Sequence, residues 1–259
     1  GQRSLTDPEQ RPRSMPQAKR QRLCAQAQLA RTRSTRLDDD ANEKYRKAGS
    51  IAGRARDYGA TLVKPGIKMI DVAEAVEKFI VEQGGQPAYP CCISIDSDAA
   101  HETPAVLDPR VFIEGMVVKL DTGVQVDGWI GDTAITVPVA TNKFDDLMQC
   151  TKDALAAALD VAKPGVMIED ISSAIETTIR SRGFKPIVNL TGHSVDQYVQ
   201  HAGVSLPNVA SNARGKLPPG MAVAIAPSRP HGPGQLRDTQ GAHTPQLTRD
   251  PPRPHPRAT

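Results

Sequence analysis

The chain has 259 residues, a length typical of one large or two small domains, and its 39% hydrophobic content is enough for a core. A net charge of +3 with 24% charged residues is a mild excess, which does not indicate nucleic-acid or membrane binding. No apolar run approaches the roughly twenty residues of a membrane helix, and the N-terminal segment lacks the apolar core of a signal peptide. Four cysteines without zinc-type spacing indicate a reduced protein, and we expect a cytoplasmic location.

Two terminal segments differ from the rest in composition. Residues 1–41 contain no valine, isoleucine or aromatic residue, and residues 227–259 contain eight prolines and five arginines. Neither segment can bury enough apolar surface to offset its ordering entropy, so both are predicted to be disordered tails. The second change of composition interrupts a strand-like run that ends at Ala226, which suggests translation in another reading frame from there on.

The segment between the tails, residues 42–226, is predicted to fold. Helical periodicity covers 41–63, 70–83, 146–162 and 168–182, with Pro-Gly or Gly punctuation beside the first two. Short strands are predicted at 92–95, 117–121 and 131–137, near Ile187, and at 221–225. This alternation is typical of an α/β or α+β architecture.

An internal repeat relates the two halves of this segment. A shift of 99 residues aligns 64–87 with 163–186 without a gap, giving nine identities in 24 positions, where about one or two would arise by chance. At a shift of 105 residues, the run 115–121 resembles 220–226, so that Asp121 corresponds to Ala226. Two copies of one unit predict a pseudo-twofold domain with a central site between its halves.

Two aspartates are candidate metal ligands. Residues 120–134 predict a hairpin of two short apolar strands, and Asp121 and Asp132 lie in or beside those strands, where they could face each other. Opposed carboxylates in an apolar setting repel each other unless a cation lies between them. The alternative interpretation is turn and surface aspartates, and Asp127-Gly128 has the sequence of a plain turn.

The histidines fall into two groups. Those in the final tail, where no scaffold would hold them, are assigned no role: His231, His243 and His255. Those in the folded segment stand beside small residues: His101, His193 and His201. A single histidine is more often structural than a ligand, but three of them favour a site. His193 follows the strand-like run 187–190, a position that suits a ligand presented at a strand end.

Two carboxylates and an imidazole suit a hard or borderline divalent ion such as Mn, Fe, Co or Zn. Two such ions that share a water lower its pKa and supply hydroxide near neutral pH, so hydrolysis is the expected chemistry. Histidines outside the coordination shell could donate a proton or stabilise a tetrahedral oxyanion.

These residues together resemble the methionine aminopeptidases of the pita-bread fold, over about residues 42–226. Five ordered motifs carry the resemblance: Ala99-Ala100-His101-Glu102-Thr103-Pro104, Val118-Lys119-Leu120-Asp121-Thr122-Gly123, Gly131-Asp132-Thr133-Ala134, Leu190-Thr191-Gly192-His193 and Gln200-His201-Ala202-Gly203. The Gly-His and His-Ala-Gly pair is similar to the type II, archaeal branch. An α/β pita-bread fold with a pseudo-twofold repeat is therefore expected, with its second half incomplete.

The resemblance implies roles for single residues. Asp121, Asp132 and His193 would be metal ligands, and His101 and His201 would contact the scissile amide and the transition state. Tyr89 and Pro90 occupy the position of an aromatic-proline pair that lines the methionine pocket in the family. The implied substrates are the N-terminal Met peptides of nascent proteins. We expect a monomer, and the basic N-terminal tail leaves ribosome association as a further option.

Three departures from the family pattern lower the expected activity. Ala226-Pro227 stands where the family has Glu-Pro, Cys92 replaces an expected asparagine, and a second metal-binding glutamate has no counterpart. The family holds two divalent ions, whereas we expect at most one, weakly bound, and low turnover. The alternatives are a catalytically inactive pita-bread module that binds ribosomes, nascent chains or RNA, and a nonfunctional gene fragment.

Overall fold

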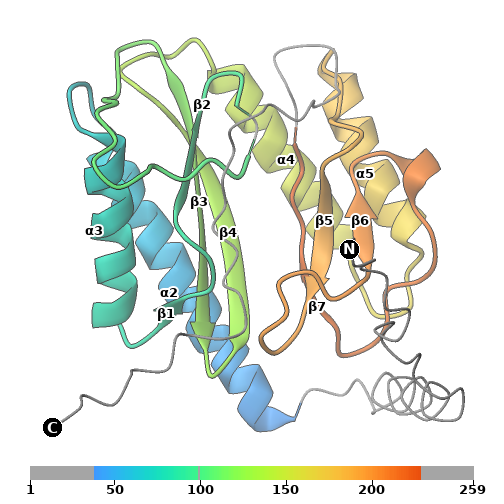
Figure 1. The fold of residues 1–259 in the computed structure, drawn as a ribbon. Coiled ribbons are helices and arrows are strands. Elements are labelled where there is room, and N and C mark those ends of the chain that lie inside the picture. The colour runs from blue at the N-terminus through green and yellow to red at the C-terminus, as the bar shows by residue number, and fades with distance from the viewer. Residues whose placement is uncertain (1–37, 99, 229–259) are drawn as a thin grey trace, which may run out of the picture. The chain divides into compact units, whose positions relative to one another are not determined.

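The computed structural model describes residues 38–98 and 100–228 (Figure 1). Its helices are α2 (Asp39–Leu62), α3 (Met69–Glu82), α4 (Asp145–Val161) and α5 (Ile168–Ser181), with a short 3₁₀ turn η1 (Ala210–Asn212). Its strands are β1 (Gln86–Pro87), β2 (Cys92–Ile95), β3 (Val117–Val126), β4 (Trp129–Pro138), β5 (Thr191–Val195), β6 (Ser205–Pro207) and β7 (Ala222–Ala224). None of the described helices is long and apolar enough to cross a membrane.

The predicted helices are confirmed to within two residues at each end. The boundary predicted for the first tail is wrong by three residues, because α2 begins at Asp39. Asp38 caps this helix by accepting a hydrogen bond from the Ala41 backbone N–H at 2.8 Å. The other predictions for the two tails concern residues 1–37 and 229–259, which lie outside the described part.

The strand predicted near Ile187 is wrong, because that segment is a loop and the strand β5 begins four residues later. Side chains satisfy the loop carbonyls in place of a strand ladder. Asn208 donates to the Leu190 carbonyl at 2.9 Å, and Asn212 donates to the Val188 carbonyl at 3.3 Å. His193 therefore lies inside a strand and does not follow one.

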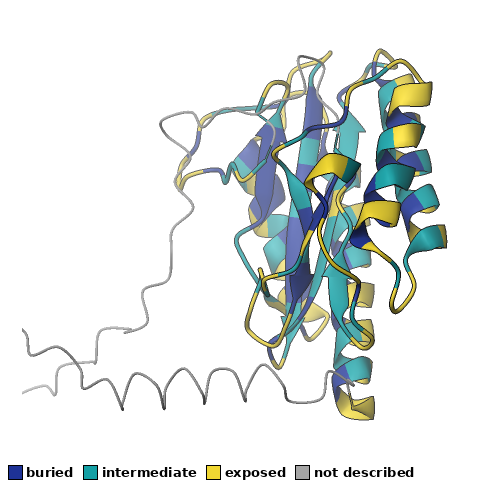
Figure 2. Cartoon of the chain, turned by 90° about the vertical axis from the view of Figure 1, so that its right-hand side faces the viewer, coloured by how far each residue is buried: buried dark blue, intermediate teal, exposed yellow. Residues whose placement is uncertain are grey.

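Two antiparallel sheets form the centre of the described part. In the first, β3 pairs with β1, β2 and β4, and in the second, β5 pairs with β6 and β7. Helices α2 and α3 pack on the first sheet around a core that includes Ile51, Val76 and Leu120, while α4 and α5 pack on each other beside the second sheet. Figure 2 shows the buried residues along the strands and on the inward helix faces.

The repeat found in the sequence is present in the fold. Helices α3 and α5 have 14 residues each and are related by the shift of 99. Each follows a glycine with positive φ, Gly66 at 84° and Gly165 at 85°. Glu77 on α3 accepts a hydrogen bond from the Cys91 backbone N–H before β2, and Glu176 on α5 accepts one from the Ala210 backbone N–H of η1, each at 2.9 Å. The two glutamates, which the repeat aligns, thus both bind a later segment of their own half, although the partner segments are not equivalent.

The second sheet is smaller than the first. Within residues 38–98 and 100–228, β4 pairs only with β3, and β7 pairs only with β5. Two cavities of about 410 Å³ and about 460 Å³ lie along β7, the first bordered by α2 and β4 and the second by α4. Both cavities include Asp132, Val223 and Ala224 in their walls. The half-buried β7 contrasts with the mostly buried β3, in line with the predicted difference between the halves.

We predict that Gly131→Ala destabilises the fold, because a Cβ at this position would lie 2.6 Å from the Gly49 backbone nitrogen and 2.7 Å from the Ala48 carbonyl carbon of α2. Helix backbone cannot yield as a flexible side chain can, so a loss of roughly 1–3 kcal/mol in the free energy of unfolding is expected. Urea unfolding followed by circular dichroism measures it. Gly53→Ala in helix α2 is the control, since no atom lies within 4 Å of its added Cβ. Equal stability of the Gly131→Ala variant and the unmodified chain would show that α2 does not pack against β4 as described.

Candidate metal centre

The β3–β4 hairpin places Asp121 and Asp132 on one face. Its turn is Asp127-Gly128, with φ of 50° and 85°, which matches a two-residue type I′ turn. Asp132 pairs with Gly123, and Asp121 pairs with Ala134, so the two aspartates are diagonal neighbours on the same face. The predicted hairpin is thus confirmed, and the two aspartates face each other diagonally across it.

The Tyr89 hydroxyl lies between these two carboxylates. Its oxygen is 2.7 Å from Asp121 Oδ1 and 2.8 Å from Asp132 Oδ1. Burial, followed by the charges of the two aspartates, raises the pKa of Tyr89 well above its ordinary value, so the phenol keeps its proton at neutral pH. One phenol proton can serve only one carboxylate at a time, and the pair therefore holds an excess of acceptors.

The second half contributes His193 and Gln200 to the same cluster. His193 Nε2 lies 3.4 Å from Asp132 Oδ2, and Gln200 Nε2 donates to that same oxygen at 2.6 Å. The His201 ring stacks at an angle on the His193 ring, with 4.2 Å between centroids. These contacts join β4 to β5 and the loop after it, at the junction of the halves where the repeat predicts a central site.

The two aspartates have opposite pKa shifts. Burial, with the charge of Asp132 second, raises the pKa of Asp121 to about 6. Burial acts on Asp132 in the same direction, but hydrogen bonds from His193, Tyr89 and Gln200 outweigh it and leave its pKa below the ordinary value. Asp132 is therefore the more firmly ionised member of the pair.

The two neighbouring imidazoles also have opposite pKa shifts. Burial tends to lower the pKa of His193, but the hydrogen bond and charge of Asp132 outweigh burial and raise it. Burial, followed by the proximity of His193 and His101, lowers the pKa of His201, which is therefore neutral near pH 7. A neutral imidazole next to an acidic pair can accept a proton from a reacting group.

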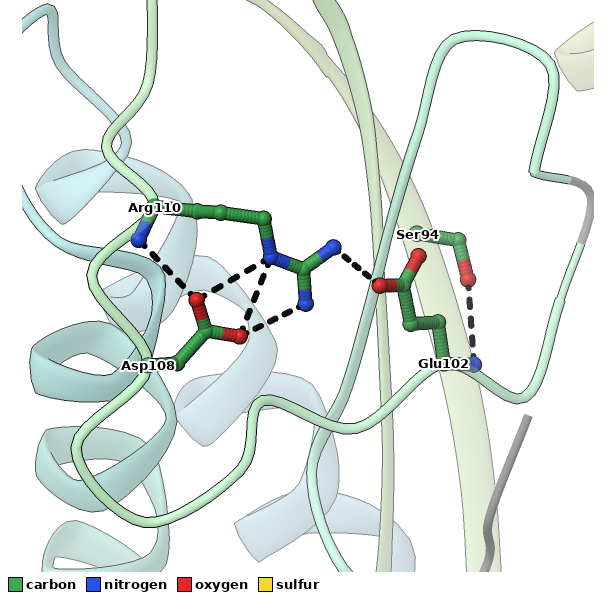
Figure 3. A network of polar contacts seen from close by, with 4 residues as sticks. All are labelled: Ser94, Glu102, Asp108 and Arg110. Carbon is green, nitrogen blue, oxygen red and sulfur yellow. Dashed lines mark hydrogen bonds and ion pairs between the residues drawn. The ribbon is translucent and has the colours of Figure 1, made fainter. Parts of the chain in front are cut away.

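The predicted residue His101 lies on a loop held by an ion-pair network (Figure 3). Arg110 donates from Nε to both carboxylate oxygens of Asp108 at 3.0 Å, and its two terminal nitrogens bind Asp108 and Glu102. The Glu102 backbone carbonyl also accepts from the Ile93 N–H of β2 at 2.7 Å. These contacts anchor the residue next to His101, which itself has a φ of 65°.

Sequence reasoning missed Gln200, Glu102, Asp108 and Arg110 as members of the site or its support. Gln200 belongs to a motif that was noted, but nothing in its spacing indicates a bond to Asp132. The Asp108-Pro109-Arg110 run has the composition of a turn, and its role depends on Glu102, which lies eight residues before Arg110. These are contacts of tertiary structure that carry no local sequence pattern.

Within the described ranges, no group of three or more His, Cys, Asp or Glu side chains is already arranged to hold a metal ion. The donor types nevertheless fit one divalent cation, because two carboxylates and an imidazole converge there and the two carboxylates repel each other. Tyr89 occupies the point between the carboxylates, which accounts for the lack of a preformed cluster. The Ala226 side chain, at the position that corresponds to Asp121 in the repeat, is not a metal donor.

Residues 43–244 match the metallopeptidase family M24. The methionine aminopeptidase of Archaeoglobus fulgidus is 46% identical over 200 residues, covering 77% of this chain and 68% of the relative. The methionine aminopeptidase of Thermococcus kodakarensis is 48% identical over 198 residues, covering 76% and 67%.

This chain belongs to the methionine aminopeptidases of metallopeptidase family M24. The crystal structure of methionine aminopeptidase from Thermotoga maritima superposes with a TM-score of 0.68 at 29% identity, covering 74% of this chain and 81% of that one. Prolidase from Pyrococcus furiosus, at 19% identity and a TM-score of 0.68, shares the fold. The chain spans about two thirds of the length of these two archaeal relatives. The predicted pita-bread architecture and metal-dependent peptidase class are thereby confirmed.

We predict that Arg110→Met lowers the free energy of unfolding at pH 7 by about 2 kcal/mol, since it leaves the buried Asp108 carboxylate without its cationic partner. Arg110 holds the pKa of Asp108 below its ordinary value. The stability from this pair is therefore fully present above pH 4 or so, and is lost as the pH falls through the lowered pKa. Urea unfolding at pH 7 and pH 3 measures both effects.

The matched control is Lys78→Met, because Lys78 pairs with Glu82 at 3.8 Å and both side chains are exposed on α3. Such an exposed pair contributes little, so this variant should unfold like the unmodified chain. An Arg110→Met variant whose stability loss is as small as that of the control would contradict the anchoring role of the network.

Proposed function

We propose that the chain removes the N-terminal methionine from peptides by hydrolysis of the first peptide bond. It binds one divalent cation weakly for this reaction, and its turnover is low. The observation that carries the proposal is the convergence of Asp121 and Asp132 from the first half with His193 from the second, 3.4 Å from Asp132. These three residues are the proposed ligands. Mn, Fe, Co and Zn all suit a mixed carboxylate and imidazole site.

The chain's own residues account for positioning and proton transfer in this proposal. A bound divalent cation supplies Lewis-acid polarisation of the scissile carbonyl. His201, neutral near pH 7 because of burial and its histidine neighbours, accepts at a ring nitrogen a proton from the water that attacks the scissile carbonyl. It returns this proton to the amine that leaves when the C–N bond breaks. His101, on the loop anchored through Glu102, contacts the scissile amide.

The proposed substrate contacts are the N-terminal methionine side chain against Tyr89 and Pro90. The Tyr89 ring packs on Gly123 beside the two aspartates, so a methionine that reaches this ring also reaches the carboxylates. The relatives' names indicate methionine as the N-terminal residue, and nascent proteins are its cellular source in this proposal.

Low turnover follows from the number of donors. Among the three proposed ligands, only the two carboxylates carry negative charge, which is enough to balance one dication. The residue of the second half that corresponds to Asp121 is Ala226, which adds no further carboxylate. Fewer carboxylates also mean weaker attraction for a dication. A metal-free module for ribosomes, nascent chains or RNA is less favoured, because such binding does not require Asp121, Asp132 and His193 to converge at the junction of the halves.

We predict that Asp132→Asn weakens Mn²⁺ binding at least about tenfold, since even indirect partners of metal ligands change affinity by that factor. Titration calorimetry on the metal-free protein measures the affinity. Release of methionine from a Met-Ala-Ser peptide, measured on the same sample, should fall in parallel.

Asp127→Asn is the matched control, because Asp127 lies in the exposed hairpin turn and pairs with Lys44 at 3.1 Å. This variant loses the same charge on the same hairpin, and its Mn²⁺ affinity should equal that of the unmodified chain. Unchanged affinity in Asp132→Asn would place the cation elsewhere and overturn the proposal.

A further inference from the structure

The Tyr89 ring packs directly on the backbone of Gly123 in strand β3. A Cβ added to Gly123 would lie only 2.2 Å from Cε1 of the Tyr89 ring, so the ring needs a glycine beneath it. Gly123 pairs with Asp132 and is two residues from Asp121, which places the ring between the two aspartates. The contact is thus specified by the strand register as well as by the side chain.

The phenol oxygen occupies the position that a bridging cation would take. It lies 2.7 Å and 2.8 Å from one oxygen of each carboxylate. A divalent ion held by the same two oxygens would lie about 2.0–2.2 Å from each, in the space between the carboxylates that the hydroxyl now fills. The hydroxyl and the cation therefore exclude each other from this point.

Resting on the proposed cation site, we propose that Tyr89 is an internal competitor for the metal: its hydroxyl holds the two carboxylates together in the metal-free chain and must leave them before a cation binds. Cation binding then breaks the hydrogen bonds to Asp121 and Asp132. Hydrogen bonds to charged groups are the stronger ones in proteins, so the competition is substantial. In the metal-free chain, a form with the hydroxyl on the carboxylates is in equilibrium with an open form that can bind a cation. The apparent affinity for a cation is lowered by the ratio of the first population to the second.

Removing the hydroxyl should therefore strengthen cation binding and destabilise the metal-free protein. Tyr89→Phe keeps the ring on Gly123 but has no oxygen between the carboxylates. The Mn²⁺ dissociation constant should fall by roughly tenfold, the factor that one hydrogen bond to a charged group contributes to an equilibrium. The melting temperature of the metal-free protein should also fall, because Asp121 then loses the Tyr89 hydroxyl as a hydrogen-bond donor and repels Asp132 with no group between the two carboxylates.

Titration calorimetry with Mn²⁺ and thermal unfolding without metal test both effects on the full chain. Tyr45→Phe is the matched control, since its hydroxyl donates to the Val195 carbonyl at 3.1 Å and its ring packs on Trp129. It loses one buried hydroxyl but no contact with an aspartate. This control should lower the melting temperature without changing the Mn²⁺ affinity.

The outcomes separate this inference from the cation site on which it rests. Tighter Mn²⁺ binding in Tyr89→Phe alone supports competition. Binding that is equal or weaker in Tyr89→Phe than in the unmodified chain overturns it, and in that case the cation site itself stands. An absence of Mn²⁺ binding in both proteins overturns the site and the inference together.

A second measurement needs no variant at position 89. The chain has four tyrosines, and 3-fluorotyrosine gives each one a ¹⁹F resonance. Single Phe variants of Tyr45, Tyr58 and Tyr198 assign Tyr89 by elimination. Addition of diamagnetic Zn²⁺ should move the Tyr89 resonance because its hydroxyl loses the carboxylates. A Tyr89 resonance that stays unchanged while calorimetry records Zn²⁺ binding would overturn the proposal.

Discussion

Two carboxylates on one face of the β3–β4 hairpin are the constraint on which the site depends. Asp121 and Asp132 are diagonal neighbours in an apolar sheet, and burial raises the pKa of Asp121 to about 6. Such a pair is unfavourable unless a donor or a cation lies against it. The surrounding groups supply donors: the Tyr89 hydroxyl, the Gln200 amide and the His193 imidazole all contact at least one of these carboxylates.

The pseudo-twofold repeat brings these donors together. The first half supplies the acidic pair and the second supplies His193, His201 and Gln200, so neither half contains the whole site. The two halves differ in their strands more than in their helices. Helices α3 and α5 are equal in length, but β7 has three residues where β3 has ten. The site thus lies between a first half with a long, mostly buried strand and a second half whose strand β7 is short and half-buried.

Local sequence patterns were sufficient for the helices, the hairpin and the repeat. The 99-residue shift predicts both α3 and α5, because glycine turns and helical periodicity are local properties. The motifs around Asp121, Asp132, His193 and His201 also identified residues that the fold brings into one cluster. His101 lies near enough for its charge to affect the pKa of Asp121, after larger effects from burial, Asp132 and Tyr89.

What sequence could not supply is the set of contacts between distant segments. An apolar run at 187–190 favours a strand by composition, yet Asn208 and Asn212 hold it as a loop, and β5 forms where two partner strands are available. Tyr89 was predicted to line a pocket, and no local pattern indicates that its hydroxyl points at Asp121 and Asp132. The Arg110 network spans at most eight residues, yet no recurring pattern predicts it, because it depends on how the loop after His101 folds back on Arg110.

The most direct test of this account is the position of a single cation. A crystal of the chain soaked in Mn²⁺ allows the ion to be located by its anomalous scattering. The account predicts one peak, coordinated by Asp121, Asp132 and the His193 ring nitrogen, with the Tyr89 hydroxyl moved away from the carboxylates. A peak that lacks His193 as a ligand, or two peaks of equal height on this face, would contradict it.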